Sequence, residues 1–387
     1  MKHLIGILAL VLLASCSKET RVSILAEGVV SDTLLAERSC FEERIMARGD
    51  REKFERTIDT LILDEGCAEL AFSVRDTHLL SLQFAPGEEG ALPASRIELI
   101  LQPGEKVAVQ IKQHRHGHLE AKVEGSKLNA EIVKLDNSAR AVHVDQHRVG
   151  RALNQAMAEK SSTVDSLRNR MMNIRTALHS LYAEYMKANP ESELSAYCLY
   201  QMGPKRGERY YRQLDPKVFK GVFRPVKEAT ELYLKDQLQR AELKTLIEEG
   251  GIAPDFALKD PKGKTVTLSS HRGKWVVLDF WGSWCSWCIK GMPRMKSVYE
   301  QYADKLEFIG IACGDKEETW RMAVERLKLP WIHVIDPMEA PVKESVAARY
   351  AVEGYPTKVI ITPEGTIHKI FKGESKEFYE ELKTLFE

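Results

Sequence analysis

Two cysteines near residue 285 have the spacing of a reactive pair. Cys285 and Cys288 are three residues apart in the segment Cys-Ser-Trp-Cys. On the first turn of a helix this spacing places both sulfurs on one face, close enough to form a disulfide without distorting the chain. The free N–H groups and the dipole at a helix N-terminus favour an anion, so we expect Cys285 to be the nucleophilic thiolate. Cys288, one turn deeper, would then attack the mixed disulfide that Cys285 forms.

A carboxylate lies shortly before these cysteines in an apolar segment. Asp279 interrupts the run Trp275–Trp281, which has the composition of a buried central strand. Burial raises the pKa of a carboxylate, so Asp279 is a candidate proton acceptor for Cys288 near neutral pH. An acid that only completes a local hydrogen-bond network would be buried in the same way. The sequence leaves both interpretations open.

Alternating strand and helix patterns surround this site and predict one α/β domain at 251–387. The linker at 248–254, which contains two glycines and a proline, precedes it. A second buried strand is expected at 306–312, parallel to the first, and later strands at Thr357–Ile361 and 366–371. Helices are expected at 290–302, at Glu317–Leu327 and at the C-terminus.

The first part of the chain predicts a β-rich domain at 16–118. Short apolar runs at 69–74, 96–101 and 107–111 have the pattern of strands. Pro103-Gly104 lies between the last two runs, and such a dipeptide between strands predicts a hairpin.

A helical region is predicted at 119–250. Seven apolar residues recur at steps of three and four, which places them on one stripe of a helix: Val164, Leu167, Met171, Ile174, Leu178, Leu181 and Tyr185. Further helices are expected at Glu193–Met202 and 217–244. The stripe favours packing against these neighbours over a coiled-coil dimer, because three heptads are short for a coiled coil.

The N-terminus has the layout of a secretory signal. A basic start, an apolar run and the small residues Ala14-Ser15 precede Cys16, which gives a signal peptide at 1–15. The apolar run is too short to span a bilayer. Leu13-Ala14-Ser15-Cys16 resembles a bacterial lipobox, which implies acylation of Cys16 and a lipid anchor. The alternative is an ordinary cleaved signal with a chance cysteine at the junction.

The C-terminal motifs resemble the thioredoxin superfamily, and within it the TlpA/ResA-like thiol-disulfide oxidoreductases. The resemblance lies in the segment 279–288, Asp-Phe-Trp-Gly-Ser-Trp-Cys-Ser-Trp-Cys, and in Gly-Tyr-Pro-Thr at 354–357. It implies that Pro356 is a cis-proline facing the dithiol, with Trp284, Trp287, Tyr355 and Pro356 binding substrate. It also implies that Pro293 kinks the active-site helix. The strands before 118 resemble, more distantly, a β-rich module that precedes such domains.

Two positions depart from that family. Trp287 stands where the family usually has proline before the second cysteine, so the local backbone regains an N–H group. Gly291 stands where the reductase subgroup often has glutamate. Any proton relay is therefore expected to rely on Asp279.

Together these features predict a multidomain, lipid-anchored thiol-disulfide oxidoreductase in the cell envelope of a diderm bacterium, facing the periplasm. We expect it to reduce protein disulfides, although the motif itself also permits oxidation or isomerisation. Its expected partners are disulfide-bearing proteins and an upstream membrane electron donor, with no cofactor beyond the dithiol. The formal net charge of zero gives no reason to expect a nucleic-acid partner. The alternatives are a binding or scaffold lipoprotein with an incidental dithiol, and a thiol peroxidase, whose threonine- and proline-bearing loop is missing around Cys285.

The other cysteines and a group of histidines give less specific expectations. Cys40 and Cys67 are either a disulfide or two single thiols, because spacing alone does not fix their geometry. Cys198 and Cys313 are expected in the core. His114, His116 and His118 alternate as on one strand face, but a polar loop is the favoured interpretation, and no metal site is predicted.

Overall fold

The computed structural model describes residues 19–29, 31–47, 54–85, 96–114 and 119–387. The predicted signal peptide 1–15, Cys16, His116 and His118 lie outside these residues. Within the described part of the chain, no helix has both the length and the apolar character needed to cross a bilayer. The chain forms two compact units, 1–234 and 235–387.

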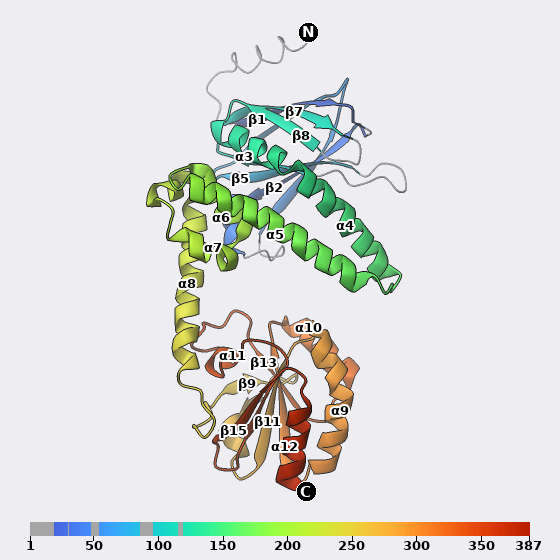
Figure 1. The fold of residues 1–387 in the computed structure, drawn as a ribbon, viewed down its shortest axis with the longest axis vertical. Coiled ribbons are helices and arrows are strands. Elements are labelled where there is room, and N and C mark those ends of the chain that lie inside the picture. Colours follow the sequence, from blue (N-terminus) through green and yellow to red (C-terminus); the bar gives the residue numbers. More distant parts are fainter. Residues whose placement is uncertain (1–18, 30, 48–53, 86–95, 115–118) are drawn as a thin grey trace. The chain divides into compact units, whose positions relative to one another are not determined.

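The first unit begins as a sandwich of two four-stranded sheets (Figure 1). One sheet has the order β4 (Cys67–Ser73), β1 (Glu19–Glu27), β7 (Lys106–Gln113), β8 (Leu119–Glu124), and the other has the order β3 (Arg56–Ile62), β2 (Thr33–Cys40), β5 (His78–Phe84), β6 (Ile97–Leu101). Apolar residues alternate along the strands, so one face of each sheet is buried in a shared core that contains Val22, Leu34, Leu82 and Val109.

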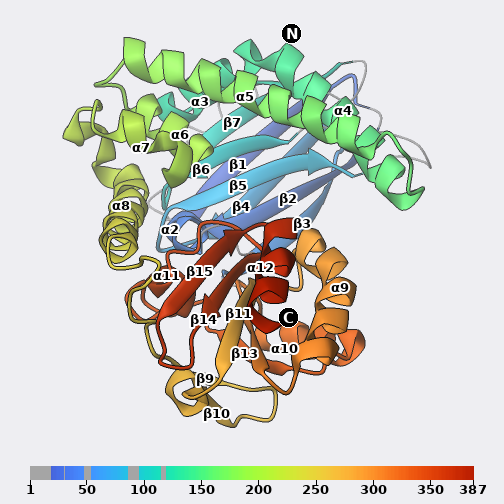
Figure 2. The same ribbon diagram turned by 60° about the horizontal axis from the view of Figure 1, so that its bottom comes forward.

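Helices form a third layer on the outer face of the second sheet (Figures 1 and 2). Leu79 of β5 and Ile100 of β6 point away from the sandwich core and pack against these helices. The layer consists of α3 (Lys127–Ser138), α4 (Arg140–Ala158), α5 (Val164–Ala188), α6 (Glu193–Met202), α7 (Pro204–Tyr211), η1 (Pro216–Phe219), η2 (Gly221–Phe223) and the start of α8 (Arg224–Lys244). A short helix, α2 (Phe41–Met46), follows β2.

Three sequence-based expectations for this unit need correction. The hairpin at Pro103-Gly104 is wrong, because β6 and β7 belong to different sheets and the turn crosses the sandwich between them. The β-rich part continues past residue 118, since β8 completes the first sheet at Glu124. The helix expected at 217–244 begins as two 3-10 turns and becomes α-helical at Arg224.

The striped helix is present as α5, Val164–Ala188. The C-terminal half of its stripe is buried in the helical core, where Ile174 and Leu178 are covered and Tyr182 and Met186 extend the contact. Packing within one chain therefore accounts for this half. Helix α4 lies along the other half, where Met171 approaches Gly150.

The second unit is built on a seven-stranded mixed sheet. Its order is β10 (Thr265–Thr267), β9 (Ala257–Lys259), β13 (Ile332–Asp336), β12 (Leu306–Cys313), β11 (Trp275–Trp281), β14 (Thr357–Ile361), β15 (Ile367–Lys372). Strands β11, β12 and β13 are parallel, as the sequence predicts for the first two; β14 runs antiparallel to β11, and β15 runs antiparallel to β14.

Helices cover both faces of this sheet (Figures 1 and 2). On one face lie α9 (Ser286–Tyr302), α10 (Glu317–Leu327) and α12 (Lys376–Phe386), which pack against side chains such as Val277 and Ala312. On the other face lie α11 (Val346–Arg349) and η3 (Leu268–His271), packed against Leu278 and Ile311. Because strand residues alternate, Asp279 and Trp281 share the face of Val277, which is the face of α9.

Candidate active site

The turn between β11 and α9 positions the two cysteines. Cys285 is the N-cap of α9, and its Sγ accepts the backbone N–H of Cys288 at 3.2 Å. The turn is held from the next strand, because Ser283 donates its backbone N–H to Asp315 at 2.8 Å and Trp284 donates its indole N–H to the Cys313 carbonyl at 3.0 Å. Close packing requires Gly282 here, since a Cβ would lie 2.5 Å from the Trp284 Nε1.

Cys285 and Cys288 form a disulfide in this structure, with their Cα atoms 5.3 Å apart. Both are buried in a cluster with Trp281 and Met292. The sequence-based pairing of these two residues is therefore confirmed. Within the described residues, the helix terminus donates a hydrogen bond to the sulfur of Cys285, the residue expected to be the nucleophile.

Two tryptophans and a proline turn flank the disulfide. The Tyr355–Pro356 peptide bond is cis, as the motif implied, and Tyr355 packs against the cluster that contains both cysteines. The ring of Trp284 meets the ring of Tyr355 edge-on, with centroids 5.3 Å apart. Trp284 is 56% exposed and Trp287 is 68% exposed, which is unusual for such large apolar side chains.

Trp287 lies apart from that pair of rings. Lys290, one turn along α9, places its Nζ 5.2 Å from the centroid of the Trp287 ring. The structure thus brings Tyr355, with Trp284 against its ring, to the cluster that holds the disulfide, whereas Trp287 extends into solvent.

Asp279 is buried on the helix side of β11, and a buried lysine faces it. Lys358 is its cross-strand partner on β14, and the Lys358 Nζ lies 3.8 Å from the Asp279 Oδ1. Burial raises the pKa of Asp279 to about 6, although the positive charge of Lys358 acts in the opposite direction. The Asp279 Oδ1 accepts no hydrogen bond from any described residue. Asp279 is therefore a buried carboxylate with a raised pKa beside a buried lysine.

A second acid, Glu374, extends this network toward solvent. Its Oε2 lies 2.8 Å from the Lys358 Nζ, and its Oε1 accepts the hydroxyl of Tyr379. The side chain of Lys358 is 1% exposed and that of Glu374 is 24% exposed, so the chain of charges runs from the core to the surface. The negative charge of Glu374 contributes to the raised pKa of Asp279.

Glu374 occupies the space that Gly291 leaves open on α9. A Cβ at position 291 would lie 2.5 Å from the Glu374 Oε2. The expectation that any proton relay relies on Asp279 stays a prediction, and the structure adds a second carboxylate, from the loop before α12, beside Gly291. The sequence contained a signal for Lys358, because a lysine within the apolar strand Thr357–Ile361 is unusual. It contained no signal for Glu374, because the position of that side chain depends on how a distant loop packs.

The remaining candidates do not join this site. Cys40 and Cys67 are free thiols, on strands of different sheets, so the disulfide alternative is wrong for this structure. Cys198 and Cys313 are buried free thiols, as expected, and burial raises the pKa of each. His114 pairs with Glu120 at 2.7 Å. The described residues contain no group of three or more side chains suited to holding a metal ion.

This geometry defines a class of protein. A disulfide at the N-terminus of a helix that follows a central parallel strand, with a cis-proline after a tyrosine that packs on the cysteine cluster, is typical of dithiol oxidoreductases with the thioredoxin fold. The α/β fold expected for the C-terminal part of the chain is therefore confirmed.

Comparison of the sequence with known proteins agrees with this class. The AhpC/TSA family matches residues 250–370. Thioredoxin-like protein YneN of Bacillus subtilis is 35% identical over 130 residues, which are 33% of this chain and 73% of that protein. Thiol-disulfide oxidoreductase ResA of Geobacillus thermodenitrificans is 34% identical over 131 residues, 34% of this chain and 72% of that protein. The thioredoxin domain of a Bacteroides vulgatus thiol-disulfide oxidoreductase aligns in structure with 28% identity and a TM-score of 0.34, covering 36% of this chain and 99% of that one.

The chain belongs to the thioredoxin-like thiol-disulfide oxidoreductases. Its enzymatic class is thus oxidoreductase, and the residues that carry the likeness lie in the second unit.

Proposed function

We propose that the protein is a lipid-anchored, extracytoplasmic enzyme that reduces disulfides of other proteins through Cys285 and Cys288. One observation carries the proposal. A reducible cysteine pair lies at the N-terminus of α9, with exposed tryptophans beside it and a buried carboxylate behind it. An incidental disulfide would not need all three features.

The reaction transfers two electrons in two exchange steps. The Cys285 thiolate attacks one sulfur of a substrate disulfide, which forms a mixed disulfide and releases the first substrate thiolate. The Cys288 thiol loses its proton and attacks the Cys285 sulfur, which releases the second substrate thiol. The enzyme then holds the Cys285–Cys288 disulfide. A membrane electron donor upstream would return it to the dithiol.

Asp279 is the proposed proton acceptor for Cys288. Its pKa of about 6 leaves it mostly ionised at neutral pH, yet close enough to neutrality to take a proton and return it. Among the described residues Asp279 forms no hydrogen bond with either sulfur, so an intervening water would carry the proton between them. The network to Glu374 offers a route for that proton to reach solvent.

The substrate surface is proposed at the apolar rim. Trp284 and Trp287 would cover the residues beside the substrate disulfide, and the backbone at Tyr355 and Pro356 would pair with an extended substrate segment. Exposed aromatic rings support this role, because tryptophan and tyrosine dominate the energetics of protein recognition. Proteins with accessible disulfides fit such a shallow, open rim.

The anchor and the location rest on the sequence alone. Leu13-Ala14-Ser15-Cys16 would provide the acylated cysteine, and the cell envelope of a diderm bacterium, on the periplasmic side, is the compartment where such an anchor and substrate disulfides coexist.

Reduction of insulin by the full chain tests the enzymatic proposal. With a chemical reductant supplying electrons, the wild type should accelerate precipitation of the reduced insulin chains. Cys285→Ser should reduce the rate to the uncatalysed background, and Cys288→Ala should prevent repeated turnover. Cys198→Ala is a control that removes a thiol outside the site. Unchanged turnover in both active-site variants would refute the proposal.

A further inference from the structure

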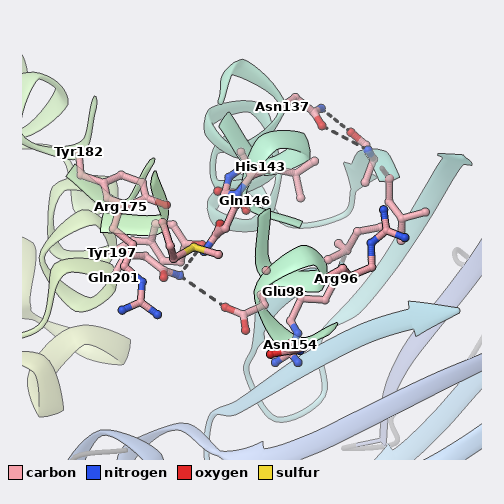
Figure 3. A pocket seen from close by; sticks show the side chains of 18 residues that line it. Arg96, Glu98, Asn137, His143, Gln146, Asn154, Arg175, Tyr182, Tyr197 and Gln201 are labelled. Carbon is pink, nitrogen blue, oxygen red and sulfur yellow. Dashed lines mark hydrogen bonds between the residues drawn. The ribbon is translucent and has the colours of Figure 1, made fainter. Parts of the chain in front are cut away.

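The first unit contains a cavity that the redox site does not use. It has a volume of about 480 Å³ and lies among helices α3, α4, α5 and α6 and the strands β6 and β8 (Figure 3). A space of this size accommodates a small molecule. Its walls carry charged side chains of both signs, which distinguishes it from a packing gap in an apolar core.

One wall is acidic and rich in hydrogen-bonding groups. Asp136 of α3 and Glu98 of β6 both line the cavity. Tyr197 and Gln201 of α6 line it too, and Gln201 points toward Glu98 (Figure 3). Gln201 donates to the Tyr197 hydroxyl at 2.8 Å and to Glu98 at 3.5 Å. Arg44 approaches Glu98 at 3.9 Å, whereas Asp136 has no ion pair with any described cation. The cavity therefore presents a carboxylate that lacks a positive partner.

The protonation of Asp136 reflects that missing partner. Burial and, to a smaller extent, the negative charge of Glu98 together raise the pKa of Asp136 to about 7, while a hydrogen bond from Tyr197 acts against both. Holding this carboxylate charged inside the cavity is costly unless a cation approaches it. A ligand cation would remove the cost and displace the proton.

Guanidinium groups line the cavity from helices α4 and α5. Arg151 of α4 has a buried Nε atom with no hydrogen-bond partner among the described residues. Arg175 enters from α5, and Figure 3 shows it near Tyr182 and Tyr197. Neither guanidinium forms an ion pair within the part of the chain that the structure describes. A guanidinium binds a carboxylate through two parallel hydrogen bonds, so a bound anion would satisfy these groups.

We propose that this cavity binds a small zwitterion, an amino acid or a short peptide, with its ammonium group at Asp136 and Glu98 and its carboxylate at Arg151 and Arg175. Unpartnered groups of both signs in one cavity favour a ligand that carries both charges over a simple anion or cation. The site lies wholly within the first unit and is independent of the dithiol. It would give the enzyme a sensing or binding function in addition to disulfide exchange.

A mixture of free amino acids and dipeptides is the first probe. Native mass spectrometry of the full chain should show at least one component retained by the wild type. Titration calorimetry then compares the retained component with its N-acetyl and C-terminal amide forms. Each blocked form should bind about tenfold more weakly or worse, because a charge-assisted hydrogen bond to a buried partner is lost. No retained component, or equal binding of the blocked forms, would overturn the proposal.

Variants assign each end of the ligand. Asp136→Asn should weaken the free amine and leave the N-acetyl form unaffected, and Arg151→Gln should weaken the free carboxylate and leave the amide unaffected. Asp165→Asn and Arg168→Gln, an exposed pair on α5, are the matched controls. Circular dichroism and the melting temperature report whether each variant folds. The assignment is contradicted if a folded Asp136→Asn variant weakens the N-acetyl form and not the free amine, or if a folded Arg151→Gln variant weakens the amide and not the free carboxylate.

The pH dependence gives a separate readout. Affinity should fall as the pH drops below about 7, because the protonated Asp136 no longer attracts the ammonium group. The other titratable or charged groups that line the cavity come from the residue before β6 and from β6, α4, α5 and α6: Arg96, Glu98, His143, Arg151, Arg175, Tyr182 and Tyr197. The fall should disappear in Asp136→Asn, and its persistence there would place the amine elsewhere.

Discussion

The carboxylate of Asp279 is held between opposing influences. Burial and the charge of Glu374 favour its protonated form, and Lys358 favours its ionised form. The result is a pKa near 6 in place of the ordinary 3.8, which means that the folded protein resists ionising this group. A residue of this kind costs stability at neutral pH and is retained where proton transfer is useful.

Replacing Asp279 by asparagine should therefore separate stability from activity. The folded state binds the Asp279 proton more tightly than the unfolded state, so stability falls as the pH rises from about 4 to about 6 and stays lower above that. At pH 7 to 8, Asp279→Asn should raise the free energy of unfolding by about 1 to 3 kcal/mol, and the gain should vanish near pH 4. Urea denaturation at both pH values measures it. Equal effects at the two pH values would show that the carboxylate is not the cause.

The same variant should slow resolution of the mixed disulfide, by roughly 100-fold if Asp279 is the general base, and leave the first attack nearly unchanged. Rapid-mixing kinetics separate the two steps. A similar slowing of both would assign Asp279 a structural role.

At the scale of elements, the loop that leads into α12 supplies Glu374 to the space beside Gly291 of α9. This contact places Glu374 beside the helix that carries the cysteines. Through Lys358 on β14, Glu374 is linked to Asp279 on β11. Glu374→Gln should lower the pKa of Asp279, because a like charge is lost and Lys358 is left to Asp279 alone. The pH profile of the resolution step should shift toward lower pH.

Gly291→Ala offers an independent route to the same effect, because its methyl group would displace the Glu374 carboxylate without removing its charge. Glu380→Gln, on the exposed side of α12, is the matched control. If the pH profiles of the resolution step in Glu374→Gln and in Gly291→Ala coincide with that of the wild type, Glu374 is not part of the network.

Elements also show what the sequence could predict. The strand Trp275–Trp281, the cysteine spacing and the Tyr355-Pro356 turn are encoded within short segments, so they were predicted correctly. Pairing across segments was not encoded in this way. The turn at Pro103-Gly104 joins strands of different sheets, and Lys358 meets Asp279 only through the register of β11 and β14. Such contacts depend on tertiary packing, which a local pattern does not contain.

At the scale of the whole molecule, the two units have separate chemical characters. The second carries the dithiol and the proton network, and the first carries a sandwich, a helical layer and the charged cavity. Tethering by Cys16 would keep both at a membrane surface. The redox chemistry itself needs no contact with lipid.

Cys16→Ser tests the tether without touching the site. The variant should leave the membrane fraction, and its rate of insulin reduction should stay within about twofold of the wild type, because the dithiol is remote in sequence and self-contained in the second unit. Fractionation with immunoblotting measures the first effect. Retention of the variant in the membrane fraction would remove the lipid anchor from the account.

The division of labour between the two cysteines is the central claim, and trapping the mixed disulfide tests it most directly. A pre-reduced Cys288→Ala variant mixed with a disulfide-bonded protein should accumulate a covalent adduct through Cys285, which non-reducing electrophoresis and peptide mass spectrometry identify. Cys285→Ser under the same conditions should accumulate little or none. Equal adduct formation by the two variants, or an adduct through Cys288 alone, would contradict the account.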